Sequence, residues 1–464
     1  MYRMLLVFLL PALVHAKPNI LFMMADDLGW NDVGYHGSEI KTPNIDTLAE
    51  KGVELDRYYA FPVCSPTRVA LMTGRSPIRQ GVDMAIGPHG GMPLDEHLLP
   101  QTLRAAGYQT FITGKWHLGL EHAASHPNNR GFDHAHGHLG GGLDYFTHLW
   151  EGGLDWHRNG KVIREEGYTT ELITEEAVSL IERRDEAKPM FLYVAFNAPH
   201  LPLQSTEKYL QRYPDIGDPH RKLFAAMVSA VDDGVGKILA TLETEGIADD
   251  TLVVWVSDNG GLSQAGADNS PLRAGKGTTF EGGLRVPGLI YQPGVLEGGK
   301  FTEMVTVLDW FQTLTTAVGV TPKNTKPFDG IDMWAALSKG EKVARSDTII
   351  GGYGNYAIFR EGWKLVEHTP RRSDTTTMHL FRVLDDPSEQ HDLIDENPDL
   401  AKELLAAIRA IPRPPSVSQV RPGEGFRTRQ EATRGGRGGG RGLDLSAGWE
   451  EETREPWVEV AIRD

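Results

Sequence analysis

Short apolar segments alternate with amphipathic segments along most of the chain. A near-continuous apolar run predicts a buried parallel strand at Pro18–Ala25, and further strands are predicted at Gly107–Thr113, Pro189–Phe196 and Thr251–Ser257. Helical spacing predicts helices over residues 43–52, 66–73, 170–184 and 221–245. Because strands and helices alternate from residue 17 to about 335, we predict an α/β domain whose large, mostly parallel sheet is sandwiched by helices.

The pattern changes after about residue 340. Short β-like pieces at 347–366 and 378–384, followed by a helical stretch at 398–411, predict a smaller α+β subdomain. From Pro412 onward the chain is rich in Pro, Gly and Arg, which is typical of a flexible or irregular tail. We therefore expect the following order of units: main domain 17–335, C-terminal subdomain 336–412 and tail 413–464.

The first sixteen residues have the features of an export signal. Arg3 provides a positive start, Met4–Leu13 is apolar, and Val14-His15-Ala16 is a small-residue cleavage site, so the mature chain would begin near Lys17. The apolar run is shorter than the roughly 20 residues needed to span a bilayer, and no other segment of the sequence is long enough. We expect a periplasmic or secreted protein that is not an integral membrane protein.

Charge and cysteine content narrow the function classes. The 464 residues carry a formal net charge of −16, which argues against a nucleic-acid binder even though Arg434–Gly442 reads RGGRGGGRG. An acidic protein can still bind an anionic substrate in a locally basic pocket. The single cysteine, Cys64, excludes an intramolecular disulfide, and one unpaired cysteine is unusual in an exported protein.

Polar residues follow directly after two of the predicted strands. Asp26 and Asp27 come after the first strand, and Asp258 and Asn259 come after TLVVWVS. Ligands of open α/β sheets bind at the carboxyl ends of strands, so the two clusters can converge. Three carboxylates and one amide oxygen suit Ca²⁺ or Mg²⁺ better than Zn²⁺. The structural alternative is that these residues cap loops or helices.

Cys64 lies in the stretch CSPTR. If residues 66–73 form a helix with Pro66 at its first position, Cys64 lies just before the helix N-terminus. Such an end has free N–H groups and a positive dipole, which favour an anionic group. The alternative for Cys64 is a small, buried apolar residue.

At this point the chain resembles the formylglycine-dependent sulfatases (type I sulfatases) of the alkaline phosphatase superfamily. The matching stretches occur in the family's order and cover roughly residues 17–412: PNILFMMADDLGW, CSPTRVALMTGR, GKWHLG, NAPH, SDNGG and GKGTTFEGG. Within the family, GGLDYFTH and PLRAGKGTTFEGGLR are most similar to arylsulfatase B-like enzymes, including bacterial polysaccharide sulfatases. The resemblance implies an alkaline-phosphatase-like fold and a sulfuric ester hydrolase of the arylsulfatase type.

The resemblance also implies roles for individual residues. A separate formylglycine-generating maturation enzyme would oxidise Cys64 to an aldehyde (3-oxoalanine), and the hydrated aldehyde would be the nucleophile. Ca²⁺, or else Mg²⁺, would be held by Asp26, Asp27, Asp258, Asn259 and the modified Cys64. Arg68 would anchor the nucleophile, Lys115 and Lys276 would bind sulfate oxygens, and His117 and His200 would transfer protons.

The chemistry of the reaction fits these roles. A cation and two ammonium groups spread the charge of a sulfate ester and stabilise its in-line transfer. His200 or Lys276 can protonate the leaving alcohol, and His117 can deprotonate the second hydroxyl so that sulfate is expelled. The alternatives are a packed loop histidine for His117, a turn histidine for His200 and a solvated loop lysine for Lys276.

Seven histidines fall between residues 117 and 148, among Gly and Asn that favour a mobile loop over the cleft. The alternation of His134, His136 and His138 leaves a zinc site open as an alternative. We name four candidate sugar-contacting residues: His138, Asp144, His157 and Arg158.

These observations predict an exported sulfatase that acts on a sulfated carbohydrate. Two alternatives remain at this point. One is a phosphonate or phosphate ester hydrolase of the same superfamily, and the other is a non-catalytic carbohydrate-binding relative. The second would need to have lost the nucleophile or a metal ligand, and the sequence retains all of them.

Overall fold

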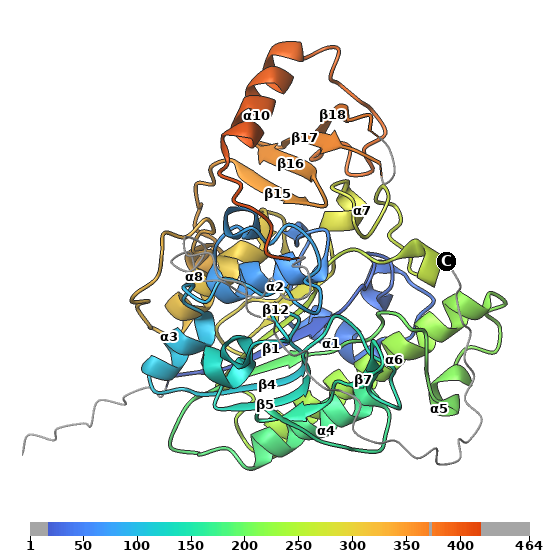
Figure 1. Ribbon diagram of the computed structural model, residues 1–464, viewed down its shortest axis with the longest axis vertical. Helices are drawn as coiled ribbons and strands as arrows, with labels where there is room; N and C mark the ends of the chain where they lie inside the picture. The colour runs from blue at the N-terminus through green and yellow to red at the C-terminus, as the bar shows by residue number, and fades with distance from the viewer. Residues whose placement is uncertain (1–16, 371–373, 419–464) are drawn as a thin grey trace, which may run out of the picture.

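A ten-stranded sheet runs through the centre of the described part of the chain (Figure 1). The computed structural model describes residues 17–370 and 374–418, so the expected export signal at 1–16 and residues 419–464 of the expected tail lie outside it. In spatial order the strands are β13 (Gly299–Phe301), β2 (Val53–Leu55), β12 (Gly288–Tyr291), β11 (Thr251–Ser257), β1 (Asn19–Ala25), β10 (Met190–Ala195), β4 (Gln109–Lys115), β5 (His134–His138), β8 (His157–Arg158) and β9 (Lys161–Val162).

The centre of this sheet is parallel. β1 pairs in parallel with both β10 and β11, β10 pairs with β4, and β4 pairs with β5, whereas β12, β8 and β9 run antiparallel to their neighbours. The register places Ala25 of β1 beside Ser257 of β11. The residues that follow these two strands therefore leave the sheet side by side.

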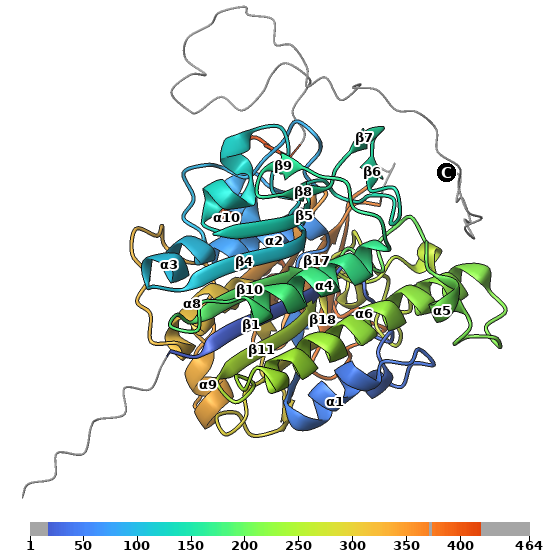
Figure 2. The ribbon, with the colours of Figure 1, turned by 90° about the horizontal axis from the view of Figure 1, so that it is seen from below.

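Helices cover both faces of the sheet, which explains the unbroken apolar strands. Ile20, Phe22 and Met24 of β1 face one core, and the alternate residues of the same strand face the other. The first core includes α2 (Cys64–Thr73), α3 (Leu99–Ala105), α8 (Trp310–Ala317) and α9 (Trp334–Lys339). The second includes α1 (Pro43–Lys51), α4 (Thr169–Glu182), α5 (Glu207–Leu210) and α6 (Pro219–Thr244) (Figure 2). This confirms the predicted fold class.

The segment expected to be a loop over the cleft contains a strand. His134–His138 forms β5, which pairs in parallel with β4, so the loop prediction is wrong for these residues. A Cβ at Gly137 would lie 2.2 Å from the carbonyl oxygen of Gly114, so a glycine there lets the two strands approach. Four further short strands follow within residues 149–162: β6 (Leu149–Trp150), β7 (Gly153–Leu154), β8 and β9.

Helix α2 begins earlier than the sequence predicts. Val63 is its N-cap and Cys64 its first residue, so Pro66 is the third helical residue rather than the first. Cys64 therefore lies within the first helical turn, where the backbone N–H groups are free of helical partners.

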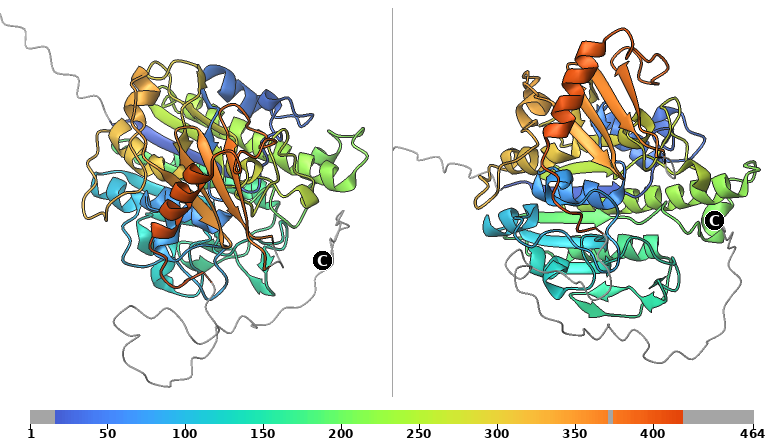
Figure 3. Two further views of the ribbon diagram at one scale, coloured as in Figure 1. Left: turned by 90° about the horizontal axis from the view of Figure 1, so that it is seen from above. Right: turned by 45° about the horizontal axis from the view of Figure 1, so that its top comes forward.

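The C-terminal subdomain is a four-stranded antiparallel sheet with one long helix. Its elements are β15 (Thr348–Gly352), β16 (Asn355–Arg360), β17 (Trp363–His368), β18 (Thr377–Arg382) and α10 (Pro398–Ala410). It packs on the side of the main sheet that carries α2 (Figure 3). Beyond α10 the chain returns to the main domain, where Gly87 N–H donates to the Ser418 carbonyl at 2.8 Å. Within the described residues, no helix combines the length and the apolar character that crossing a membrane requires.

A buried ion cluster joins the two parts. Lys364 of β17 donates to Glu281 at 2.9 Å and to Glu389 at 2.8 Å, and all three side chains are buried. Glu281 belongs to the short helix α7 (Glu281–Leu284) of the main domain, and its second carboxylate oxygen accepts from the Tyr59 hydroxyl. Burial raises the pKa of Glu389. Lys364 therefore compensates two carboxylates that are cut off from water.

Lys364→Ala is expected to destabilise the protein by about 3–5 kcal/mol, because it leaves two buried carboxylates without a cation. Urea unfolding of wild type and variant measures the difference. Lys161→Ala, in exposed β9, is the matched control and should change stability by less than about 0.5 kcal/mol. A loss below about 1 kcal/mol for Lys364→Ala would show that the cluster does not hold the subdomain in place.

Candidate active site

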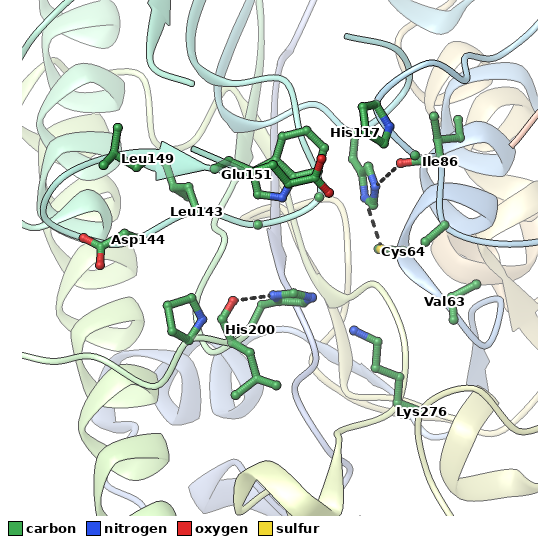
Figure 4. Close-up of a pocket in the computed structure, with 18 of the residues that line it drawn as sticks. Val63, Cys64, Ile86, His117, Leu143, Asp144, Leu149, Glu151, His200 and Lys276 are labelled. Carbon is green, nitrogen blue, oxygen red and sulfur yellow. Dashed lines mark hydrogen bonds between the residues drawn. The ribbon is translucent and has the colours of Figure 1, made fainter. Parts of the chain in front are cut away.

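A cavity of about 860 Å³ opens at the carboxyl ends of the parallel strands, above Cys64 (Figure 4). His117, which follows β4, and His200, which follows β10, line it together with Lys276. The other lining residues are Val63, residues 85–88, 141–144 and 149–151, Leu201, Pro202 and Tyr353. The cavity is therefore built by loops that a rigid sheet positions, which is the usual place of a site in this class of fold.

The polar residues after β1 and β11 meet at the floor of this site. Asp26, Asp27, Asp258 and Asn259 are all buried, and Asp27 N–H donates to the Asp258 carboxylate at 3.2 Å. Asp26 Oδ1 and Asn259 Oδ1 have no hydrogen-bond partner in the described part of the chain. Unpaired buried oxygens are costly unless a donor or a cation meets them. The predicted convergence of the two clusters is thus present, and its donor set fits a hard divalent cation.

His200 joins this cluster. Its ring lies with Asp26 and Asp27 in a group whose candidate ligand atoms are all within 4.8 Å of one another, and within the described residues this is the only such group of three. The sequence assigned His200 to proton transfer alone. His134, His136 and His138 form no comparable group within the same residues, so the zinc alternative finds no support.

Two buried cations, Lys115 and Arg68, and the half-buried Lys276 neutralise the three carboxylates. Lys115 Nζ donates to Asp26 in a short contact, and Lys276 Nζ donates to Asp27 at 2.6 Å. Arg68 donates to Asp258 at 2.9 Å and to Asp26 at 3.3 Å. Both lysines, which the resemblance assigns to the sulfate, therefore pair here with the expected metal ligands.

The Arg68 guanidinium is fixed by hydrogen bonds to four groups. Besides the two carboxylates, its guanidinium donates to the Lys115 carbonyl at 3.0 Å and to the Tyr193 hydroxyl at 3.2 Å. The side chain is completely buried and does not line the cavity. These contacts fix the carboxylates in place. The predicted contact of Arg68 with residue 64 stays a prediction.

The charges around the cluster set its protonation. Burial would raise the pKa of Asp26, but Lys115, His200 and Arg68 outweigh burial and hold that pKa below its ordinary value. Burial and the neighbouring Asp26 raise the pKa of Asp258 well above its ordinary value. A divalent cation at this site would offset the mutual repulsion of these two carboxylates.

His117 faces Cys64 with a defined ring orientation. Its Nδ1 lies 3.2 Å from Cys64 Sγ, and its Nε2 lies 3.0 Å from the Ile86 carbonyl oxygen. A carbonyl can only accept, so the ring proton belongs on Nε2 and Nδ1 carries a free lone pair. Burial, Lys115 and Arg68 lower the pKa of His117 well below its ordinary value, which keeps the ring neutral. His117 can therefore accept a proton from residue 64.

His200 has the opposite orientation, and it lies across the cavity from His117 (Figure 4). Its Nδ1 donates to the Leu201 carbonyl at 2.7 Å, and its Nε2 lies 3.8 Å from Asp27 Oδ2. Burial and Lys276 lower the pKa of His200 to about 4. The two histidines are thus held by different backbone carbonyls and face the cavity from two sides.

Two glycines that sequence reasoning did not single out separate these histidines. A Cβ at Gly141 would lie 2.8 Å from the His117 ring, and a Cβ at Gly142 would lie 3.3 Å from the His200 ring. A side chain at Gly141 would have to displace His117. The run of glycines in the sequence is the only local signal for this close approach.

The four predicted sugar-contacting residues separate into two groups. Asp144 lines the cavity. His138 and His157 line a different, much smaller cavity beside β4 and β5, and Arg158 is paired with Glu165 at 2.7 Å and Glu176 at 2.9 Å. Of the four, only Asp144 therefore lies in the cavity above Cys64, and a sugar contact for it stays a prediction. Trp150, Glu151 and Tyr353 are among the lining residues that the sequence did not suggest.

The sequence matches known proteins over most of its length. The family model described as Sulfatase matches residues 18–320. Arylsulfatase J from Mus musculus is 34% identical, over 84% of this chain and 75% of its own. N-acetylgalactosamine-6-sulfatase from Homo sapiens is 35% identical, over 71% of this chain and 67% of its own.

Solved structures share the fold. Ps i-CgsB in complex with k-i-k-neocarrahexaose is 36% identical with a TM-score of 0.79, covering 90% of this chain and 96% of that one. The PsFucS1 sulfatase from Pseudoalteromonas sp. is 28% identical with a TM-score of 0.71, covering 86% of this chain and 92% of that one. Both likenesses extend over the main domain and the C-terminal subdomain together.

Proposed function

Since this chain belongs to the sulfatase family and is a sulfuric ester hydrolase, we propose that it removes sulfate from a sulfated carbohydrate. The observation that carries this proposal is the cavity of about 860 Å³ that ends on Cys64 and the carboxylate cluster. A sulfate group fills only a small part of such a volume, and the rest suits a sugar with its neighbour. The relative solved with neocarrahexaose supports a carbohydrate substrate.

Residue 64 supplies the nucleophile after maturation. The motif CSPTR stands at the start of α2, and Cys64 Sγ lies 3.2 Å from His117 Nδ1, which carries the free lone pair. The hydrated aldehyde offers a hydroxyl in place of a thiol. His117 Nδ1 accepts a proton from residue 64, and the Ile86 carbonyl keeps the ring in the tautomer that this step requires.

Asp26, Asp27, Asp258 and Asn259, together with the modified residue 64, hold the divalent cation, which is Ca²⁺ or Mg²⁺. The two unpartnered oxygens of Asp26 and Asn259 in the described structure support this assignment. When bound, the cation neutralises charge on the sulfate oxygens. Lys115 and Lys276 now donate to Asp26 and Asp27, and they can turn to the sulfate when these carboxylates bind the cation.

Lys276 and His200 serve the leaving alcohol: Lys276 can donate the proton directly, whereas His200, whose Nδ1 proton is held by the Leu201 carbonyl and whose pKa is lowered to about 4, donates from Nε2 only after taking up a second proton. Both line the cavity on the side away from His117, where the sugar would lie. Because both side chains line the cavity, both can reach the ester oxygen that joins the sulfate to the sugar. The phosphonate or phosphate ester alternative has no observation of its own in its favour, and the non-catalytic alternative conflicts with a complete set of active-site residues.

We also propose that the protein is exported from the cytoplasm, which the signal-like sequence of residues 1–16 supports. The mature enzyme would meet its polymeric substrate in the periplasm or outside the cell. N-terminal sequencing of the protein from its native cells is expected to begin near Lys17. A chain that retains Met1 would contradict export by this signal.

A panel of sulfated oligosaccharides tests the carbohydrate assignment. The panel contains glycosaminoglycan and algal oligosaccharides, with 4-nitrophenyl sulfate, phosphate and phosphonate esters as references. We expect sulfate release from at least one oligosaccharide with a kcat/KM above that for any phosphate or phosphonate. An enzyme that hydrolyses 4-nitrophenyl sulfate and none of the oligosaccharides would refute the substrate class.

Single-turnover kinetics separate the two histidines. His117→Ala is expected to release the leaving group in a burst and sulfate slowly, because the final expulsion of sulfate lacks its base. His200→Ala is expected to slow the first step by roughly 10²-fold or more for a sugar sulfate and far less for 4-nitrophenyl sulfate, whose acidic phenol hardly needs a proton. Equal losses on both substrates for His200→Ala, or no burst for His117→Ala, would contradict this division.

A further inference from the structure

We propose that the outer part of the cavity binds the ring of the sugar that carries the cleaved sulfate, and that this ring bears no other charged group. The enzyme would then select against a second anionic group on the same sugar. This inference rests on the proposed function, because it concerns the sugar beyond the sulfate. Three features of the described cavity lining support it: its charges, its two hairpin turns and its aromatic rings.

Positive charge is confined to the inner end of the cavity. Of the described residues that line it, Lys276 is the only lysine or arginine, and Lys276 is bonded to Asp27 at the floor. The other charged lining residues besides the histidines are Asp144 and Glu151. Figure 4 places Asp144 at the opposite side of the cavity from Cys64 and Lys276. The inner end therefore suits one sulfate, and the described lining of the outer part offers no cation for another.

Asp144 is held as a charged group. Its carboxylate accepts from the backbone N–H of Phe146 at 3.1 Å and of Thr147 at 2.7 Å, and from Gln204 Nε2 at 2.7 Å. Burial opposes these bonds, but together they hold the pKa of Asp144 below its ordinary value. A sulfate or uronate next to this carboxylate would be repelled without compensation, which is how like charges disfavour a wrong ligand.

Two hairpin turns direct side chains to the same cavity. Glu151 has a φ of 47° and precedes Gly152 between β6 and β7, and Tyr353 has a φ of 52° and precedes Gly354 between β15 and β16. Two-residue turns of this kind favour Asn-Gly or Asp-Gly, because the first residue is left-handed. A glutamate and a tyrosine replace the usual Asn or Asp in these two turns, and both side chains line the cavity.

Two aromatic residues line the cavity, Trp150 from β6 and Tyr353 from the turn between β15 and β16. Trp150 stands directly before the Glu151 turn, and its ring packs over Gly140, where a Cβ would approach it to 2.8 Å. Tyr353 belongs to the C-terminal sheet and is 45% exposed. A pyranose presents C–H groups on its faces and hydroxyls on its edge. Aromatic rings bind the faces, and a carboxylate such as Glu151 accepts from the edge hydroxyls.

Competition against 4-nitrophenyl sulfate tests the proposal and does not require the natural sugar. The inhibitors are the mono- and disulfated forms of galactose and N-acetylgalactosamine, each pair differing by one sulfate on the same ring. We expect the best monosulfated sugar to inhibit at a concentration at least tenfold below that of its disulfated partner. Equal or tighter inhibition by the disulfated sugar, or no inhibition by any sugar, would overturn the proposal. Failure to hydrolyse 4-nitrophenyl sulfate would instead contradict the proposed function.

Two variants test whether the hairpin turns cause the preference for the monosulfated sugar. Glu151→Lys should reduce the preference for the monosulfated sugar at least threefold. Tyr353→Asn keeps a residue that suits the left-handed turn and should raise the inhibition constant of that sugar about tenfold. Glu361 has a φ of 47° and precedes Gly362 at the opposite end of β16, so Glu361→Lys and Glu361→Asn are matched controls and should change neither value. Unchanged constants in both hairpin variants would refute the subsite.

Discussion

Cys64→Ala is expected to lower kcat for sulfate-ester hydrolysis by roughly 10⁴-fold or more, since it removes the nucleophile. Cys64 is buried at the first position of α2, and its sulfur faces the lone pair of His117. Steady-state turnover of 4-nitrophenyl sulfate measures the loss. The small change in side-chain volume should leave the melting temperature within a few degrees of wild type.

Cys64→Ser sharpens this prediction. A serine has a hydroxyl for the first step but lacks the second hydroxyl whose deprotonation expels sulfate. The variant should release no more than one equivalent of nitrophenol per active site and then stop. Sustained turnover by the serine variant would contradict the two-hydroxyl scheme.

Mass spectrometry tests the maturation of residue 64 directly. The peptide that contains this residue in active, mature enzyme should be about 18 Da lighter than the cysteine form, as conversion of a thiol to an aldehyde requires. A fully active preparation in which Cys64 retains its full mass and reacts with thiol reagents would refute the modification.

Removal of the divalent cation is expected to have the second largest effect. Exhaustive chelation should reduce turnover to the background, and Ca²⁺ or Mg²⁺ should restore it, because without the cation Lys115 and Lys276 stay paired with Asp26 and Asp27 and the charge on the sulfate oxygens is not neutralised. Full turnover after chelation would show that these residues hold no catalytic metal.

Asp27→Asn provides a readout that does not depend on activity. The amide keeps the shape of Asp27 and one oxygen, but it removes a charged ligand that accepts from Asn259 at 2.7 Å and Lys276 at 2.6 Å. Ca²⁺ at 100 times its Kd should stabilise the wild type by about 2.7 kcal/mol, and the same concentration should stabilise the variant far less. Thermal unfolding with and without Ca²⁺ measures both. Asp249→Asn, an exposed residue before the other end of β11, should respond like the wild type.

The sequence by itself predicted the central sheet and the polar cluster at the carboxyl ends of its strands. The runs at β1, β10 and β11 are almost entirely apolar because both faces of these strands are buried, so their pattern does not depend on distant contacts. Asp26 and Asp258 follow such strands directly. Their convergence could therefore be predicted before the register between Ala25 and Ser257 was known.

The local sequence pattern did not predict a strand whose formation depends on the neighbouring strand. The stretch His134–His138 has histidines and a glycine in place of β-branched residues, and it becomes β5 because β4 provides a hydrogen-bonding edge. The start of α2 was placed two residues late for a related reason. Pro66 favours the first turn of a helix generally, and which residue of that turn it occupies depends on the cap at Val63.

Only the tertiary structure decided how the cavity beyond the sulfate is lined. His138, His157 and Arg158 are close to Asp144 in the sequence, but strand pairing carries them into other surroundings. Trp150 and Tyr353 are about 200 residues apart, and they line one cavity because the C-terminal sheet packs beside the main domain. A sequence pattern reports whether a residue is buried in its own element. Which residues share a cavity depends on how whole elements pack, and the pattern of each element carries no information on that.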